Sequence, residues 1–352
     1  MSAAASTPIL TGTASALALP VRAADRLRWL WLRALGPLAK PLVRDRELRV
    51  AVAGSTLLVV SLALTAVAPL WLLAISPIVW GVPHVLSDVR YLWVRPGHAE
   101  RWTLWVAVGG PLVALSITAD TSFGLAAAAG AALFARGPAW RKAIVLTALA
   151  PVIGAARAEP FLAAVLFAHA HNFVGVALWW CWRRRARRLH AIPLLVFVLG
   201  CAAILAGGLD PIVLALDGLD PRPSGMGIHY HIAALAPGVP GMLAVRLVLL
   251  FAFAQAAHYV VWVRLVPEED RPRETPRTFA ASLRALAGEM GWPAVLLTIA
   301  AALGLAGWAA FDLYMARTGY LRAVLFHGHL EVAAAALFFV SGATPRASTE
   351  GA

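Results

Sequence analysis

The 352-residue sequence is poor in cysteine, lysine and acidic residues. Its two cysteines, Cys181 and Cys201, lie inside or at the ends of apolar stretches, which excludes a disulfide framework and a thiolate metal site. Only Lys40 and Lys142 are lysines, and Asp and Glu together number 18. The net charge of +12 therefore comes from arginine. Because the arginines lie in short segments between apolar stretches, we expect them to set membrane topology and predict no nucleic-acid partner.

Several catalytic motifs are also missing. The sequence has no G-x-G-x-x-G motif between a strand and a helix and no G-x-S-x-G motif, which removes the usual signals for nucleotide-dependent redox enzymes and serine hydrolases. It has no H-x-x-x-H or H-x-x-H-H box, which argues against a two-iron membrane desaturase or hydroxylase. No internal repeat is evident, so an inverted-repeat transporter is not supported.

Apolar residues are abundant instead. They make up 61% of the chain, and the mean hydropathy is +0.75. Long runs with few charges predict an all-α, polytopic transmembrane bundle in the lipid bilayer. Ten spans are expected, of which the fourth and fifth are short: about 51–73, 75–95, 102–118, 121–135, 143–157, 160–182, 191–209, 242–264, 292–312 and 321–341.

The basic residues orient this bundle. With the N-terminus inside, 25 of the 30 Lys and Arg residues fall on the cytoplasmic side, so we expect both termini in the cytoplasm and a multi-pass protein of the cytoplasmic (inner) membrane. Residues 1–50 are expected to form a tail, with 1–20 flexible, and a basic interfacial helix or solvated arm over 23–44. Residues 51–342 form the membrane domain, and 343–352 are a second tail. Loop 210–241 lies outside as a re-entrant segment or cap, and loop 265–290 lies inside with a helix near 278–289.

Histidines are concentrated where they are costly. Eight of the ten lie in or beside apolar stretches, and six of these form three H-x-H pairs. An unpaired polar group in hydrocarbon costs several kcal/mol, and imidazole is the commonest side-chain ligand for transition metals. These histidines therefore predict a buried metal centre. The eight are His84, His169, His171, His229, His231, His258, His327 and His329.

Helix geometry divides the pairs. Residues two apart on a helix point about 200° apart, so only one histidine of a helical pair can bind a given ion. We predict as metal ligands one residue from each of four spans, namely His84, His169, His258 and His327. Their partners His171 and His329 would then act around the site, unless it holds two metals. The outer pair, His229 and His231, could cap the site or be ordinary loop residues.

Other polar groups accompany these histidines. Asp88 and Glu331 each follow a histidine by four residues and so share its helix face. They are the candidate catalytic carboxylates, as extra ligands or as acceptors that orient an imidazole. Asn172 and Gln255 are candidates for supporting the site. Alternatively, Asp88 pairs with Arg90, and Glu331 is a neutral residue bonded to another helix.

Histidine and carboxylate ligands without thiolate favour non-haem Fe(II), and also suit zinc, manganese or copper. A site among membrane helices favours a hydrophobic small-molecule substrate that enters from the lipid. The chain is therefore interpreted as a metal-dependent oxygenase. A haem-binding electron carrier, a metal or proton transporter and a scaffold with structural histidines stay open as alternatives.

Two segments resemble a known family. Residues 81–92 (GVPHVLSDVRYL) resemble the opening motif of the Brp/Blh family of membrane-embedded carotene-cleaving oxygenases, and residues 258–267 (HYVVWVRLVP) are similar to a later helix of that family. The resemblance implies a dioxygenase with histidine-bound iron and a carotenoid substrate. It implies that His84 and His258 are iron ligands and that Asp88 orients one. The family usually has a second histidine four residues after the later one, where this chain has Trp262.

Overall fold

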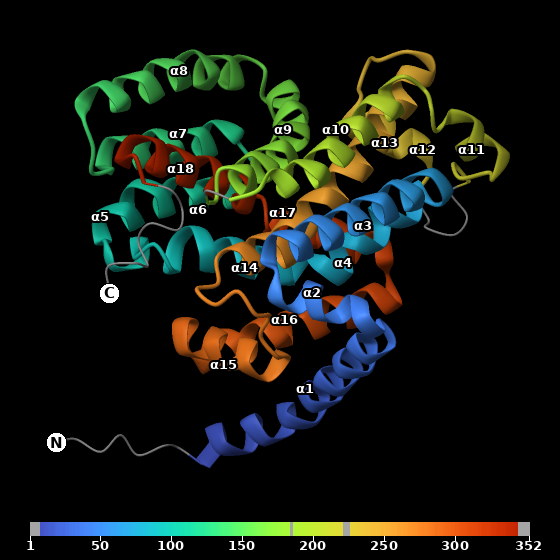
Figure 1. The fold of residues 1–352 in the computed structure, drawn as a ribbon. Helices are drawn as coiled ribbons and strands as arrows, with labels where there is room; N and C mark the ends of the chain where they lie inside the picture. Colours follow the sequence, from blue (N-terminus) through green and yellow to red (C-terminus); the bar gives the residue numbers. More distant parts are fainter. Residues whose placement is uncertain (1–7, 184–185, 221–225, 344–352) are drawn as a thin grey trace.

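A computed structural model describes residues 8–183, 186–220 and 226–343 of the chain. Across these ranges the secondary structure is entirely helical, and Figure 1 shows the helices packed into one body with α1 beside it. The outermost parts of the predicted tails, 1–7 and 344–352, lie outside the described residues. So do Arg184, Arg185, Arg222 and Arg346, which the predicted orientation used.

Eight helical segments are long and apolar enough to cross a membrane, which confirms a multi-pass helical protein. Adjoining helices make up several of them. In chain order the segments are α3 (Arg46–Val67), α4 with a π-helical end η2 (Pro69–Val94), α8 (Ala139–Ala158), α9 (Pro160–Trp180), η5 with α10 (Arg188–Leu205), α13 with η6 and α14 (Gly241–Glu269), α16 (Trp292–Phe311), and α17 with α18 (Leu313–Ser341).

The remaining two predicted spans are shorter helices. Residues Trp102–Thr118 comprise α5 (Trp102–Leu104), η4 (Trp105–Gly109) and α6 (Gly110–Thr118), and α7 (Thr121–Phe134) follows directly. All ten predicted segments are thus helical. The predicted span 143–157 is extended by four residues at its start in α8, whereas α7 stays short.

The basic leader folds against the loop 265–290. Helix α1 (Pro8–Ala34) begins inside the predicted flexible tail, where Ala and Leu favour a helix, and η1 (Gly36–Leu38) and α2 (Ala39–Arg44) continue the chain to α3. The helix predicted near 278–289 is α15 (Phe279–Met290). Asp25 of α1 accepts hydrogen bonds from the first backbone amides of α15, at 2.6 Å from Phe279 and 3.2 Å from Ala280, so the two helices lie side by side.

Helix α13 (Gly241–Val260) forms the axis of the bundle. It belongs to the most buried of the eight spans, whereas α8 is the least buried. Its apolar side chains pack with those of α3, α9 (Pro160–Trp180) and α10 (Ala191–Leu205) in the largest core cluster. A second core joins α6 and α7 to α18 (Phe326–Ser341), and its alanines let α7 and α18 approach closely. Gln255 and His258 of α13 are therefore surrounded by protein on all sides.

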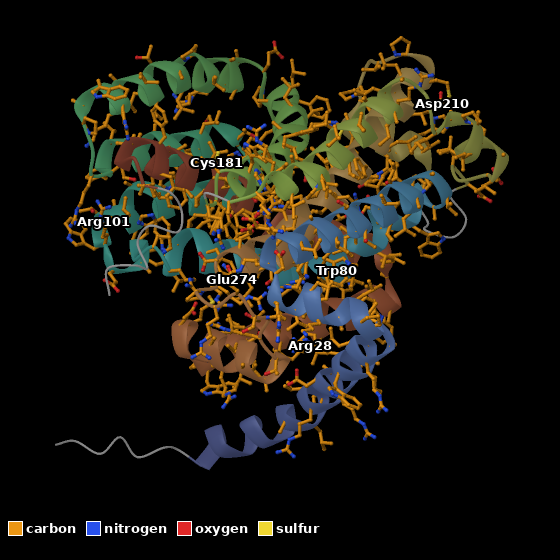
Figure 2. The ribbon with its side chains drawn as sticks, in the orientation of Figure 1. Arg28, Trp80, Arg101, Cys181, Asp210 and Glu274 are labelled. Atoms are coloured by element: carbon orange, nitrogen blue, oxygen red, sulfur yellow. The ribbon has the colours of Figure 1, made fainter. Side chains whose placement is uncertain are left out.

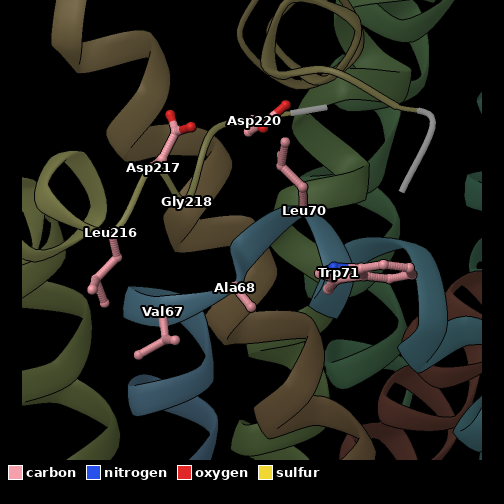
Figure 3. Close-up of a pocket in the computed structure, with 8 residues that line it drawn as sticks. All are labelled: Val67, Ala68, Leu70, Trp71, Leu216, Asp217, Gly218 and Asp220. Atoms are coloured by element: carbon pink, nitrogen blue, oxygen red, sulfur yellow. The ribbon is translucent and has the colours of Figure 1, made fainter. Parts of the chain in front are cut away.

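The segment 210–241, predicted as an outer loop, is partly helical. It contains α11 (Asp210–Ala215) and α12 (Ile228–Leu235), which packs on α13 and α9, while residues 221–225 lie outside the described part. A cavity of about 310 Å³ lies where the α11 loop meets the turn between α3 and α4 (Figure 3). Because His229 and His231 are on a helix, they point in different directions. His231 is buried, whereas His229 is exposed.

Two π-helical turns interrupt the central spans. The segment η2 (Val89–Val94) directly follows α4 (Pro69–Asp88), and η6 (Val261–Leu265) directly follows α13. The Ser87 hydroxyl donates a 2.6 Å hydrogen bond to the Trp262 carbonyl, which joins α4 to η6. Isolated π-helical turns inside α-helices occur frequently at functional sites.

Candidate metal centre

Four spans bring a histidine to one point inside the bundle. The rings of His84 on α4, His258 on α13 and His327 on α18 are in mutual contact, with centroid distances of 4.8 to 5.9 Å. His171 on α9 joins them, 5.2 Å from His258 and 5.4 Å from His327. We call these four residues the histidine cluster. Its members come from four separate helices, as the sequence predicts.

Three members of the cluster form, together with Asp88, a set of atoms spaced for a metal ion. One ligand atom from each of His84, Asp88, His258 and His327 lies within 4.8 Å of each of the others. Two ligands on opposite sides of an ion with bonds of ~2.1 Å are about 4.2 Å apart, so a shift of a few tenths of an ångström would seat an ion. Three imidazoles and one carboxylate form a donor set for iron, zinc or manganese.

Backbone contacts fix the tautomers of the cluster. The Nδ1 atom of His84 lies 3.2 Å from the Trp80 carbonyl oxygen, that of His171 lies 3.2 Å from Phe167 O, and that of His327 lies 2.6 Å from Val324 O. A carbonyl oxygen only accepts, so each Nδ1 carries the hydrogen and each Nε2 keeps its lone pair. This orientation of imidazole by a carbonyl is the usual second contact of a metal-binding histidine.

Two carboxylates lie in the same region without a cation. Asp88 and Glu331 have no exposed surface, and among the described residues neither carboxylate pairs with an arginine or lysine; Asp88 has no hydrogen-bond partner there, and Glu331 contacts only ring nitrogens. Arg90 bonds to Glu289 at 2.8 Å, so the alternative that it pairs with Asp88 is wrong. Both oxygens of Asp88, Nε2 of His84 and both ring nitrogens of His258 are buried and unpartnered. Such a concentration of unsatisfied polar atoms is what a metal ion would remove.

Glu331 adjoins the ligand set through His258. Its Oε1 is 3.3 Å from His258 Nε2, and both side chains are fully buried. It also lies near enough to Asp88 for their charges to interact. Two carboxylates would balance one divalent cation, which matters because an unbalanced charge inside a bilayer is costly.

The prediction for the first H-x-H pair is reversed in the structure. His171 faces the cluster, whereas His169 points toward α12, with its Nε2 2.9 Å from the Leu235 carbonyl oxygen and its ring 5.4 Å from that of Phe251. The physical reason is that α9 is apolar on every face, so its sequence shows no amphipathic side. One signal was available. Gly175, one turn after His171, lies so close to the site that a Cβ there would be 2.8 Å from His258 Nδ1.

The other histidines lie outside the ligand set. His329 points away from the cluster. Its ring stacks on that of Phe167, with a centroid distance of 3.6 Å, and lies against Gly124 of α7. His231 is buried on α12. Burial, and secondarily the Arg317 guanidinium, lower its pKa to about 4, so it is neutral at pH 7. Neither this residue nor His229 is in the ligand set that the structure brings together.

The side-chain amides of Gln255 and Asn172 do not contact the candidate ligand atoms directly. Gln255 donates a 3.1 Å hydrogen bond to the Tyr259 hydroxyl, and the Tyr259 ring lies 4.6 Å from that of His84. Asn172 is fully buried and donates to Ala168 O in its own helix at 3.0 Å. The sequence reasoning did not single out Tyr259, although it follows His258 directly and supplies a hydroxyl beside the cluster.

A buried arginine on α17 was also not singled out from the sequence. Arg317 on α17 (Leu313–Ala323) is 5% exposed and donates from Nε to the Leu73 carbonyl oxygen at 2.8 Å. That carbonyl is free because Pro77, four residues later in α4, has no N–H.

No protein family model, no curated protein and no solved structure matches this chain. The resemblance to the Brp/Blh family therefore stays a prediction from two short segments. The site has to be interpreted from its own geometry.

Proposed function

We propose that the protein is an integral membrane metalloenzyme, a non-haem iron oxygenase that acts on a lipid or isoprenoid substrate, such as a carotenoid. The observation that carries the proposal is the convergence of His84, Asp88, His258 and His327, whose ligand atoms all lie within 4.8 Å. Iron held by these residues would supply the capacity to activate dioxygen. The sequence resemblance supports the choice of iron and of a carotenoid-like substrate.

The residues of the chain would each have a defined part. His84 and His327 present Nε2 to the ion because backbone carbonyls hold their Nδ1 hydrogens. Asp88 supplies negative charge to the ion, and Glu331 holds the ring of His258 and balances the second positive charge. The apolar walls around the site exclude water, which protects a reactive centre and favours a hydrophobic substrate.

Close packing of the rings favours a bare ion over a haem. A haem bound between two histidines needs a flat space as wide as the porphyrin between their rings. In this cluster, other imidazoles occupy that space, since His327 is in ring contact with His84, His171 and His258. A haem-based electron carrier would require these helices to separate.

The test is the metal content of the detergent-purified protein, measured by elemental analysis for the wild type and three variants. We expect about one iron per chain in the wild type, loss of the metal in His84→Ala, and partial loss in His171→Ala. The matched control is His169→Ala, which removes an imidazole from the same helix and leaves the cluster intact.

The outcomes separate the alternatives. Equal metal content in the wild type and His84→Ala would overturn the site, and a Soret band would overturn the bare-ion assignment. Bound metal without oxygen uptake in the presence of carotenoid or lipid would reject the oxygenase and favour a transporter.

A further inference from the structure

A large cavity lies between the interfacial helix α1 and the membrane bundle, on the other side of α4 from the histidine cluster. Its volume is about 940 Å³, at the upper end of the usual range of small-molecule pockets, which is room for a headgroup and part of its acyl chains. Leu27 and Trp31 of α1 form one wall, and Val52 and Leu57 of α3 form the facing wall. All four side chains are at least 36% exposed, so they present apolar surface to the cavity without covering each other.

The polar part of this cavity is almost entirely cationic. Seven arginines line it and only one carboxylate, Glu268. Arg90 and Arg95 are neutralised by Glu289 and Asp270. The remaining five arginines have a single lining carboxylate between them.

Glu268 is shared by three of these five. Its Oε1 is 2.5 Å from Arg49 Nη2, its Oε2 is 2.7 Å from Arg264 Nη1, and Arg271 also pairs with Oε2. Burial, and then repulsion from Arg264, Arg49 and Arg46, lowers the pKa of Arg271 to about 9. Three guanidinium groups thus share one carboxylate, and of the three only Arg49 is also attracted by the more distant Asp45 and Glu274, so cations outnumber anions around Glu268.

The other two arginines stand at the rim with no carboxylate partner in the part of the chain that the structure describes. Arg28 of α1 reaches only the Pro276 carbonyl oxygen, at 3.5 Å, and Arg277 follows in the same loop. Figure 2 shows Arg28 on α1 and Glu274 on the loop above it, whose backbone carbonyl accepts from Arg49. Cationic side chains therefore outnumber anionic ones in the lining of the cavity.

We propose that this cavity binds an anionic phospholipid, with its acyl chains between α1 and α3 and its phosphate among the arginines. Apolar walls beneath a ring of cations match the two ends of such a lipid. A zwitterionic lipid would fit the walls equally well but would bring a positive group beside the arginines. The inference is independent of the metal site.

The experiment compares thermal unfolding of the delipidated protein after addition of dioleoyl phosphatidylglycerol, dioleoyl phosphatidylcholine or inorganic phosphate. We expect a clear rise in unfolding temperature with phosphatidylglycerol only. In Arg28→Gln/Arg277→Gln, binding of that lipid should weaken about fivefold for each arginine removed, or about 25-fold for both. The matched control is Arg284→Gln, an exposed arginine of α15 that does not line the cavity.

A second variant tests the apolar part without changing charge. Ala53→Phe, on the α3 wall, would fill part of the cavity and should reduce lipid binding while the metal content stays at the wild-type level. Equal stabilisation by the two lipids, or unchanged affinity in the double arginine variant, would overturn the proposal. Stabilisation by inorganic phosphate alone would overturn it in favour of a simple anion site. Because metal content is measured separately, failure here leaves the proposed oxygenase unaffected.

Discussion

The histidine cluster and the arginine network around Glu268 are both buried polar regions of an apolar protein, but they are unsatisfied in opposite ways. In the histidine cluster, acceptor and carboxylate atoms face one another with no cation, as with Asp88 and Glu331. In the arginine network every carboxylate is engaged, and Glu268 alone binds three arginines. The first region lacks positive charge and the second lacks negative charge.

This difference shows that buried polarity does not by itself indicate function. A buried ion pair can be structurally complete, and it then acts as a clamp between segments distant in the sequence. The sign of the missing charge tells what kind of partner a region would accept. A cation fits among His84, Asp88 and His258, and an anion fits beside Arg271. Replacing a carboxylate by its amide should therefore have different consequences in the two regions.

The largest effect on the fold is expected from Glu268→Gln. The substitution leaves Arg49, Arg264 and Arg271 without their shared carboxylate, and breaking a buried pair costs about 3–5 kcal/mol. Thermal unfolding in detergent should show the loss, and added Arg271→Met should restore part of it by removing one cation. Glu100→Gln, an exposed carboxylate outside the network, is the control. Wild-type stability of Glu268→Gln would show that the network is not a clamp.

Asp88→Asn, in contrast, should lower metal affinity without lowering stability. We expect metal affinity to fall by more than about 100-fold, because a ligand is lost as well as its charge, while the metal-free protein unfolds at an unchanged or higher temperature. Chelator competition measures the first quantity and calorimetry the second. Glu159→Gln, an exposed carboxylate before α9, serves as the control. A variant that retains metal but loses stability would place Asp88 among structural residues instead.

Glu331→Gln should give a smaller effect of the same kind. The amide can still contact His258 but carries no charge, so metal affinity should fall about 10- to 100-fold, as for other groups that orient a ligand. The same chelator titration applies. A loss as large as that of Asp88→Asn would make Glu331 a direct ligand, and no loss would remove it from the site.

The smallest effect is expected at Ser87, whose hydrogen bond joins α4 to η6 between the histidine cluster and the arginine network. Ser87→Ala removes the hydroxyl that donates to the Trp262 carbonyl and should cost about 1 kcal/mol of stability, with metal affinity nearly unchanged. Ser116→Ala, whose hydroxyl bonds within its own helix, is the comparison. If Ser87→Ala instead released metal, the hydrogen bond would have to be regarded as part of the site.

Sequence reasoning found the elements of the bundle because hydropathy depends only on nearby residues. All ten predicted segments are helical, and three of the four predicted ligands, His84, His258 and His327, do meet. The choice between His169 and His171 failed because it depends on which helices surround α9. A helix that is apolar on every face gives no sign in its sequence of which face is directed toward the site. The arginine network was missed for a related reason, since Arg49 and Glu268 are 219 residues apart and only the fold brings them together.

The π-helical turns have a consequence for how these regions are connected. In α4 the turn η2 begins after Asp88, and η6 begins three residues after His258 of α13, so each turn follows a candidate ligand. A π-helical turn is an α-helix with one extra residue, which changes the direction of all later side chains by about 100°. Deleting one residue from each turn would preserve the ligand geometry but swing Arg90 and Arg264 away from their carboxylates. The two turns thus set how the side chains before them are oriented relative to those after them. They let the same two helices direct Asp88 and His258 toward the histidine cluster and Arg90 and Arg264 toward their carboxylates.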